Sequence, residues 1–337
     1  MTGAVPTVLR LGAATAWLLA WLAGSLAAAA GLVAVERTPT WLPEAGAATL
    51  TVLFAVALTR RSGGRVWFWS LLVVVPVVAA LTLDQRWLLS SVAVLAAVLG
   101  GITAVMLTKP AASPLRLLYE YLLALVLAAS AGLAVAAWGA PVDPMRFPLA
   151  VLALTLTLTI ALIWQLGAGY HGIGRRGLVL IAGGAMLVTL VLVYSRMLRE
   201  YGSVTVTEAV ESAVAWTTDR LGGGVPRPIE VLVGFPALVW GIWVRSSRRQ
   251  GWWMCAFGTV GTATLATTLA NPEVELENAG LSTAYSVVLG LLLGLLVIRI
   301  DALLTRGRRR DAGRRARREG WEPDPVRPEP GRTTPLR

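Results

Sequence analysis

The chain has 337 residues, of which 56% are hydrophobic and only 15% are charged. Soluble domains carry about 25% charged residues, so this composition excludes an ordinary soluble fold. The net charge is +11, but the basic residues gather between apolar runs and in the C-terminal tail, which argues against a nucleic-acid-binding protein.

The first apolar run, residues 11–35, follows Arg10 and ends in small residues, as a signal peptide does. Its apolar core is longer than the roughly 7–15 residues of a signal peptide, so we predict a retained membrane span. Because a span needs about 20 apolar residues, further spans are expected at 42–59, 66–83, 87–107, 117–138, 148–167, 177–195, 229–244, 252–270 and 281–304. The sequence therefore predicts an all-α, polytopic transmembrane bundle of about ten spans within residues 1–304.

The connections between these spans alternate between basic and acidic. Cytoplasmic connections of membrane proteins are enriched in Arg and Lys, which fixes the expected orientation. One set carries Arg60, Arg61, Arg65, Lys109, Arg116, Arg175, Arg176, Arg245, Arg248 and Arg249, and the other carries Glu36, Glu44, Asp84, Asp143, Glu273, Glu275 and Glu277. We therefore predict that both termini are cytoplasmic and that residues 196–228 form an extracytoplasmic loop.

Within this loop, Thr205 and Glu208 have the spacing of a capping box. They predict an amphipathic helix with an acidic polar face, which ends at the glycines 222–224. Arg196, Arg199 and Arg227 lie on the outer side, against the positive-inside bias.

Two interpretations of these arginines stay open. They pair with nearby acids such as Glu230, or they form an anion-binding site at the outer surface with Glu230 beside it, since arginine presents a planar fork that suits phosphate and carboxylate.

Glu120 lies about one turn into the fifth expected span, four residues after Arg116. An ionisable group at membrane depth is a functional candidate, while the spacing from Arg116 favours a helical ion pair. We therefore keep Glu120 as an intramembrane polar candidate. Cys255 and His171 are the only cysteine and histidine, which excludes an intramolecular disulfide and a multi-histidine metal site. We expect no metal, no cofactor and no catalytic residue.

Residues 305–337 are first Arg-rich and then Pro-rich. Such a composition does not bury a core, so we predict a disordered, basic cytoplasmic tail that touches anionic lipid or docks a partner.

The segment Pro226–Pro236 reads PRPIEVLVGFP. It resembles the C-terminal part of a family of uncharacterised bacterial polytopic membrane proteins that are associated with genes for a cell-wall polysaccharide pyruvyl transferase. The family pattern is roughly Pro-Arg-x-x-Glu-x-Leu-x-Gly-x-Pro, and the matching residues are Pro226, Arg227, Glu230, Leu232, Gly234 and Pro236. The chain departs from the family at Phe235, where the family often has histidine. The resemblance covers roughly the C-terminal third and implies a role in assembling or exporting envelope polysaccharide, without supplying a reaction.

Three hypotheses follow for a multi-pass protein of the bacterial cell membrane. The first is a non-enzymatic component of envelope polysaccharide assembly or export. The second is a transporter or lipid-carrier flippase. The third is a membrane-embedded glycosyltransferase with Glu36 as its base. The expected partners are the lipid bilayer, an anionic lipid or polyprenyl-linked saccharide, and other membrane proteins, with no nucleic acid.

Overall fold

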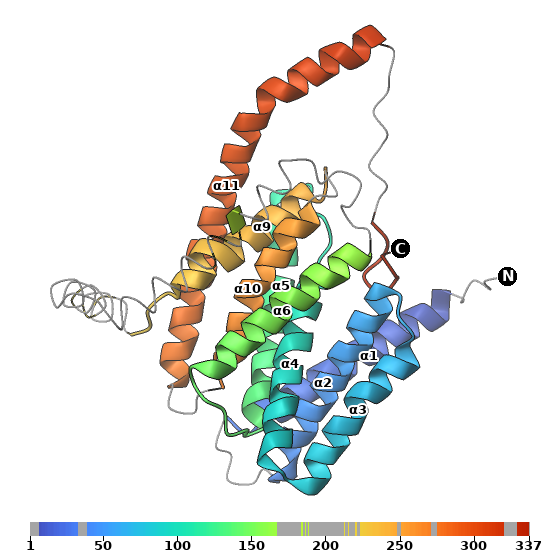
Figure 1. The fold of residues 1–337 in the computed structure, drawn as a ribbon, viewed down its shortest axis with the longest axis vertical. Helices are drawn as coiled ribbons and strands as arrows, with labels where there is room; N and C mark the ends of the chain where they lie inside the picture. Colours follow the sequence, from blue (N-terminus) through green and yellow to red (C-terminus); the bar gives the residue numbers. More distant parts are fainter. Residues whose placement is uncertain are drawn as a thin grey trace.

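The computed structural model describes residues 7–32, 39–166, 183, 184, 186, 188, 212, 215, 220, 223–247, 251–270, 275–319 and 329–336. All regular elements in these ranges are helices (Figure 1). They are α1 (Thr7–Ala29), α2 (Trp41–Ser62), α3 (Val66–Leu83), α4 (Arg86–Met106), α5 (Pro114–Ala137), α6 (Arg146–Gln165), the π-helix η1 (Glu230–Gly234), α9 (Phe235–Val244), α10 (Gly251–Thr267) and α11 (Leu276–Glu319).

Seven of the described helices are long and apolar enough to cross a membrane. They are α1 to α6 and the first part of α11, and each coincides with an expected span. The predicted all-α, multi-pass membrane architecture is thereby confirmed, while the total of about ten spans and the cytoplasmic position of the termini stay predictions. The expected eighth and ninth spans are the shorter helices η1–α9 and α10.

The expected seventh span, at 177–195, lies outside the described residues except for Gly183, Gly184, Met186 and Val188. The same holds for most of the predicted outer loop and its amphipathic helix, of which the structure describes Ser212, Ala215 and Arg220 before residue 223.

Large apolar side chains cover the outside of several helices. On α3, Leu71, Leu72 and Val75 are each more than half exposed, and on α11 the same holds for Leu292 and Leu296. Exposed aliphatic surface of this extent is unfavourable in water, at about 25 cal/mol per Å², but is the normal contact surface of a span with lipid tails. These faces indicate contact with the bilayer.

Helix α10 is a central helix of the bundle. Its residues from Gly251 to Ala263 are all buried, and it contacts α4, α5, α6 and α9. Close approach depends on small residues, because a Cβ at Gly258 would lie 2.9 Å from Cα of Leu238. Hydroxyls add polar contacts between helices, as Thr262 shows by donating its hydroxyl to the carbonyl of Gly101 at 2.9 Å.

Helix α11 packs against α9 along a stripe of glycines. A Cβ at Gly290 would lie 2.5 Å from Cβ of Phe235, and one at Gly294 would lie 2.6 Å from Cβ of Val239. Helix α9 is thus a shared neighbour of α10 and α11.

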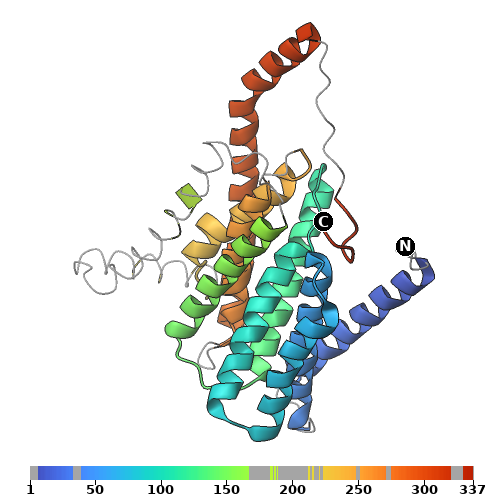
Figure 2. The same ribbon diagram turned by 45° about the vertical axis from the view of Figure 1, so that its right-hand side comes forward.

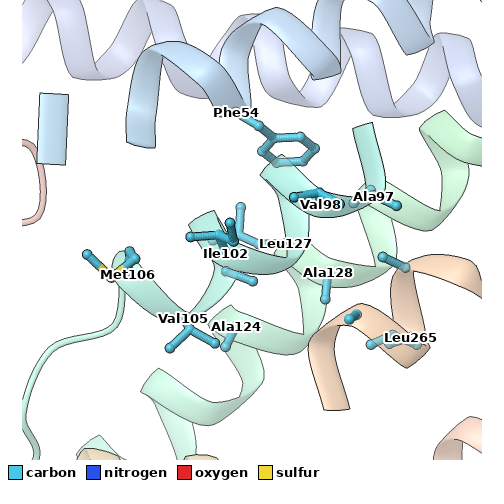
Figure 3. Close-up of a cluster of buried hydrophobic side chains, with 14 of the residues drawn as sticks. Phe54, Ala97, Val98, Ile102, Val105, Met106, Ala124, Leu127, Ala128 and Leu265 are labelled. Atoms are coloured by element: carbon cyan, nitrogen blue, oxygen red, sulfur yellow. The ribbon is translucent and has the colours of Figure 1, made fainter. Parts of the chain in front are cut away.

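Aliphatic and aromatic side chains pack α2, α4 and α5 against one another. Figure 3 shows Phe54 of α2 above Val98 and Ile102 of α4, next to Leu127 and Ala128 of α5. Figure 2 shows α1, α2 and α3 on one flank of the bundle and α9 and α11 on the other. Helices α4, α5 and α10 lie between these two flanks and contact one another.

The carboxylate of Asp143 caps the start of α6. One of its oxygens accepts hydrogen bonds from the backbone N–H groups of Met145 at 2.9 Å and Arg146 at 2.8 Å. These two bonds favour the charged form, so they lower the pKa of Asp143 from its ordinary value of 3.8.

A carboxylate with a lowered pKa stabilises the folded state above its ordinary pKa and loses that effect as the pH falls through the lowered value. We therefore expect Asp143→Ala to lower the melting temperature of the detergent-solubilised protein at pH 7, and the difference from wild type to disappear at a pH below the lowered pKa. An equal difference at both pH values would show that Asp143 does not act through its charge.

The C-terminal region differs from the predicted disordered tail. Helix α11 continues as one helix to Glu319, and residues 329–336 lie against the bundle (Figure 1). The continuation follows from helix propensity, since Arg and Ala are strong helix formers. The return follows from specific polar contacts of Glu329 and Arg332, which overall composition does not reveal.

Candidate functional site

The antiparallel course of the helices brings several charged residues to one end of the bundle, here called the basic end. Arg61 lies in the last turn of α2, Glu120 lies in the second turn of α5, and Arg245 directly follows α9. All three side chains are almost fully buried, with 0%, 1% and 3% exposure. Together with Glu329 and Arg332 of the C-terminal segment they form the basic-end cluster.

Arg61 joins α2 to the C-terminal segment. Its Nε donates to the carbonyl of Met106 at 3.0 Å, and the amide N–H of Leu336 donates to the carbonyl of Arg61 at 3.1 Å. Its Nη1 donates at 2.7 to 3.4 Å to three carbonyls of the segment, those of Pro330, Gly331 and Thr334. Arg61 thus holds four residues of the segment's backbone, three through its side chain and one through its carbonyl.

Arg245 is fixed from two sides. Its guanidinium stacks on the ring of Trp252 at 3.6 Å and donates to both the hydroxyl (2.8 Å) and the carbonyl (2.9 Å) of Thr108. The remaining edge forms a bidentate pair with Glu329, with Nε–Oε1 at 3.1 Å and Nη2–Oε2 at 2.5 Å. Bidentate Arg–carboxylate pairs are among the strongest polar contacts in proteins.

Glu120 receives a second bidentate pair. Its carboxylate accepts from Nη1 and Nη2 of Arg332 at 2.7 and 2.6 Å and from the amide of Lys109 at 2.8 Å. The expected helical partner, Arg116, is exposed instead. The pairing with Arg332 was not foreseen because it joins residues 212 positions apart in the sequence.

A second polar cluster lies at the opposite end and contains the family-like segment; we call it the motif cluster. Arg227 donates through Nη1 to Glu230 at 3.1 Å and to the hydroxyls of Thr268 at 2.8 Å and Thr283 at 3.5 Å. The amide of Arg227 donates to the hydroxyl of Ser286 at 2.9 Å. The segment is thereby tied to α10 and to α11.

Glu230 is fully buried at the start of η1. Its Oε1 accepts from Arg227, whereas its Oε2 is buried without a hydrogen-bond partner among the described residues. Of the two interpretations of the outer arginines, pairing with a nearby acid therefore applies to Arg227, which pairs with Glu230 and whose side chain is only 25% exposed. Arg196 and Arg199 lie outside the described residues, so an outer anion site that includes them stays a prediction. Glu36 also lies outside the described residues.

Sequence reasoning did not single out Arg61 and Arg245 as site residues. Both stand in a series of basic residues at the ends of spans that are expected to be cytoplasmic. In the sequence they do not differ from exposed neighbours such as Arg60 and Arg65. The one available signal was the Glu-Pro-Gly-Arg sequence at 329–332, which places an acid and a base around a turn.

Among the residues that the structure describes, no three His, Cys, Asp or Glu side chains gather in a way that could hold a metal ion. Cys255 is free and fully buried, with its Sγ 3.7 Å from Nη1 of Arg245. The chain matches no protein family, no curated protein and no solved structure.

Proposed function

We propose that this multi-pass membrane protein is a component of bacterial cell-envelope polysaccharide assembly or export that works by binding and has no catalytic centre of its own. The observation that supports the proposal is the motif cluster. Four of the six residues that match the polysaccharide-associated family, Arg227, Glu230, Gly234 and Pro236, lie at the junction of η1, α9, α10 and α11.

The matching residues at this junction each contribute a different contact. Arg227 and Glu230 form the ion pair of the junction, and Pro236 is buried at the start of α9. Gly234 approaches the backbone of α10 so closely that a Cβ would lie 2.3 Å from the nitrogen of Gly261. This local geometry gives a physical reason for an Arg, a Glu and a Gly at this spacing in the present chain.

A gene deletion followed by chemical analysis of the envelope tests the proposal. We expect the deletion strain to lose most of one surface polysaccharide and the wild-type gene to restore it. In complemented strains, Arg227→Gln should restore clearly less polymer than wild type, because the change breaks the ion pair with Glu230. Arg227→Lys keeps the charge and should give an intermediate level.

Arg146→Gln is the matched control, because Arg146 is an exposed arginine at the same end of the bundle and outside the motif. Immunoblotting of the membrane fraction separates loss of function from loss of protein. Polysaccharides unchanged in amount and composition after deletion would rule out the envelope role.

A lipid-carrier flippase or transporter is a second candidate, favoured by the unpartnered Oε2 of Glu230. Buried ionisable groups in membrane spans mark substrate and proton pathways. A transporter of this kind should lose translocation of a fluorescent polyprenyl-phosphate sugar in proteoliposomes when Glu230 is changed to Gln. Translocation at the wild-type rate would remove the argument for Glu230.

A further inference from the structure

The basic-end cluster places two buried guanidinium groups against a single carboxylate. We infer that Arg61 and Arg245 form a binding site for a phosphate group, and that Glu329 of the chain's own C-terminal segment occupies this site as an intramolecular ligand. The site lies at the opposite end of the bundle from the motif cluster and is independent of the proposed envelope role.

Both arginines are anchored to the bundle by contacts that do not involve Glu329. Arg61 is anchored by the carbonyl of Met106, and Arg245 is anchored by the hydroxyl and carbonyl of Thr108 and by the ring of Trp252. Met106 and Thr108 flank the end of α4, so one short stretch of backbone positions both guanidinium groups. A site whose donors are fixed beforehand loses little side-chain entropy when a ligand binds.

The carboxylate of Glu329 forms hydrogen bonds with only one of the two guanidinium groups. Its two oxygens are both taken by the fork of Arg245. Nη2 of Arg61 is buried, forms no hydrogen bond with any residue that the structure describes, and lies 3.7 Å from Oε2 of Glu329. The side chain of Arg61 is itself fully buried, so within the described part of the chain this donor lacks a hydrogen-bond acceptor.

A phosphate group fits this arrangement better than a carboxylate does. A phosphomonoester carries three terminal oxygens in a tetrahedral arrangement and a charge of about −1.5 to −2 at pH 7. It can therefore bind the fork of Arg245 with two oxygens and still present a third to Nη2 of Arg61. It would also balance the two positive charges more closely, and buried cations without a counter-charge are strongly unfavourable.

The C-terminal segment competes with such a ligand because it belongs to the same chain. Its docking is intramolecular and therefore occurs at a high effective concentration. The pair of Arg332 with Glu120 and the backbone contacts to Arg61 hold the segment next to the two guanidinium groups. Weakening the segment's contacts should therefore strengthen phosphate binding.

A phosphate group can come from a lipid headgroup or from a soluble phosphomonoester, and these sources share the same recognition chemistry. Two arms of one experiment separate them. In the first, glycerol 3-phosphate is titrated by calorimetry into the full-length protein in phosphatidylcholine nanodiscs. In the second, the melting temperature is compared between nanodiscs with and without phosphatidic acid.

Glu329→Gln removes the competing charge without replacing any residue of the helices. We expect it to bind the phosphate probe of at least one arm about tenfold more tightly than wild type, because the intramolecular ligand is weakened. Arg332→Gln, which weakens the segment at a distance from the two guanidinium groups, should shift binding in the same direction. Glu277→Gln removes an exposed carboxylate elsewhere and should change nothing.

The arginines are tested in the Glu329→Gln background. Adding Arg61→Lys, which keeps the charge but not the fork, should abolish most of the gain, whereas Arg60→Gln, at the exposed neighbouring arginine, should keep it. A gain with phosphatidic acid alone identifies a lipid headgroup, and a gain with glycerol 3-phosphate alone identifies a soluble ligand. No gain in either arm, or an equal gain with Arg61→Lys and Arg60→Gln, would overturn the inference.

Discussion

A Gly234→Ala variant is expected to lose most of its folded protein. The added Cβ would lie 2.3 Å from the nitrogen and 2.4 Å from Cα of Gly261, and both are backbone atoms of the buried helix α10. Neither can rotate away, so η1 and α10 would have to separate. Overpacking of a buried contact costs about 1–3 kcal/mol and more where backbone must move, while the same change at an exposed helical site is neutral or stabilising.

The measurement is the fraction of monodisperse protein in detergent, followed by its melting temperature. Gly280→Ala is the matched control, because Gly280 is a helical glycine of α11 whose Cβ would meet nothing within 4 Å. We expect Gly280→Ala to reach or exceed the wild-type melting temperature. A Gly234→Ala protein as stable as Gly280→Ala would show that η1 and α10 do not lie this close.

Glu120→Gln should release the C-terminal segment from the bundle. The change removes the charge that accepts both Nη groups of Arg332 at 2.7 and 2.6 Å. Arg332 is partly exposed and can return to water, whereas the docked position in the Glu120→Gln variant would leave it without a counter-charge and with the carbonyl of Leu107 as its other acceptor. Removing one partner of a buried pair typically costs about 3–5 kcal/mol, which exceeds what the remaining neutral amide can supply.

Release can be followed by labelling a cysteine placed at position 336 with a water-soluble maleimide. Leu336 packs against the hydrophobic core, so labelling should be slow in the parent and faster by at least tenfold with Glu120→Gln. The natural Cys255 is buried and gives only background. Arg116→Gln, at the exposed arginine one turn earlier, should leave labelling slow. Equal acceleration by both changes would point back to the helical pair of Arg116 and Glu120.

The fold was predictable to the extent that lipid imposes it. Long apolar runs must form helices in a bilayer because every backbone polar group needs a partner. For this reason the expected spans at 66–83 and 87–107 coincide closely with α3 and α4. The division of the eighth span into η1 and α9 was not predictable, since it depends on the fit of Gly234 and Phe235 against α10.

The site was predictable only where a local motif marked it. Arg227 and Glu230 are three residues apart, and their pairing follows from helical spacing. The basic-end cluster depends on contacts between distant parts of the chain, such as the bond of Arg61 to Gly331 over 270 positions. No periodicity or spacing encodes such a contact, and composition favoured disorder for the segment that makes it.

The C-terminal segment, residues 329–336, also links the two flanks of the bundle. Helix α11 is anchored by its glycines to α9 on one flank, and residues 329–336 grip Arg61 of α2 on the other. Helix α11 and residues 329–336 therefore fix the C-terminal part of the chain to both flanks of the bundle. A truncation before residue 329 would remove the contacts with Arg61 without touching any span, and would show how much of the bundle's rigidity comes from them.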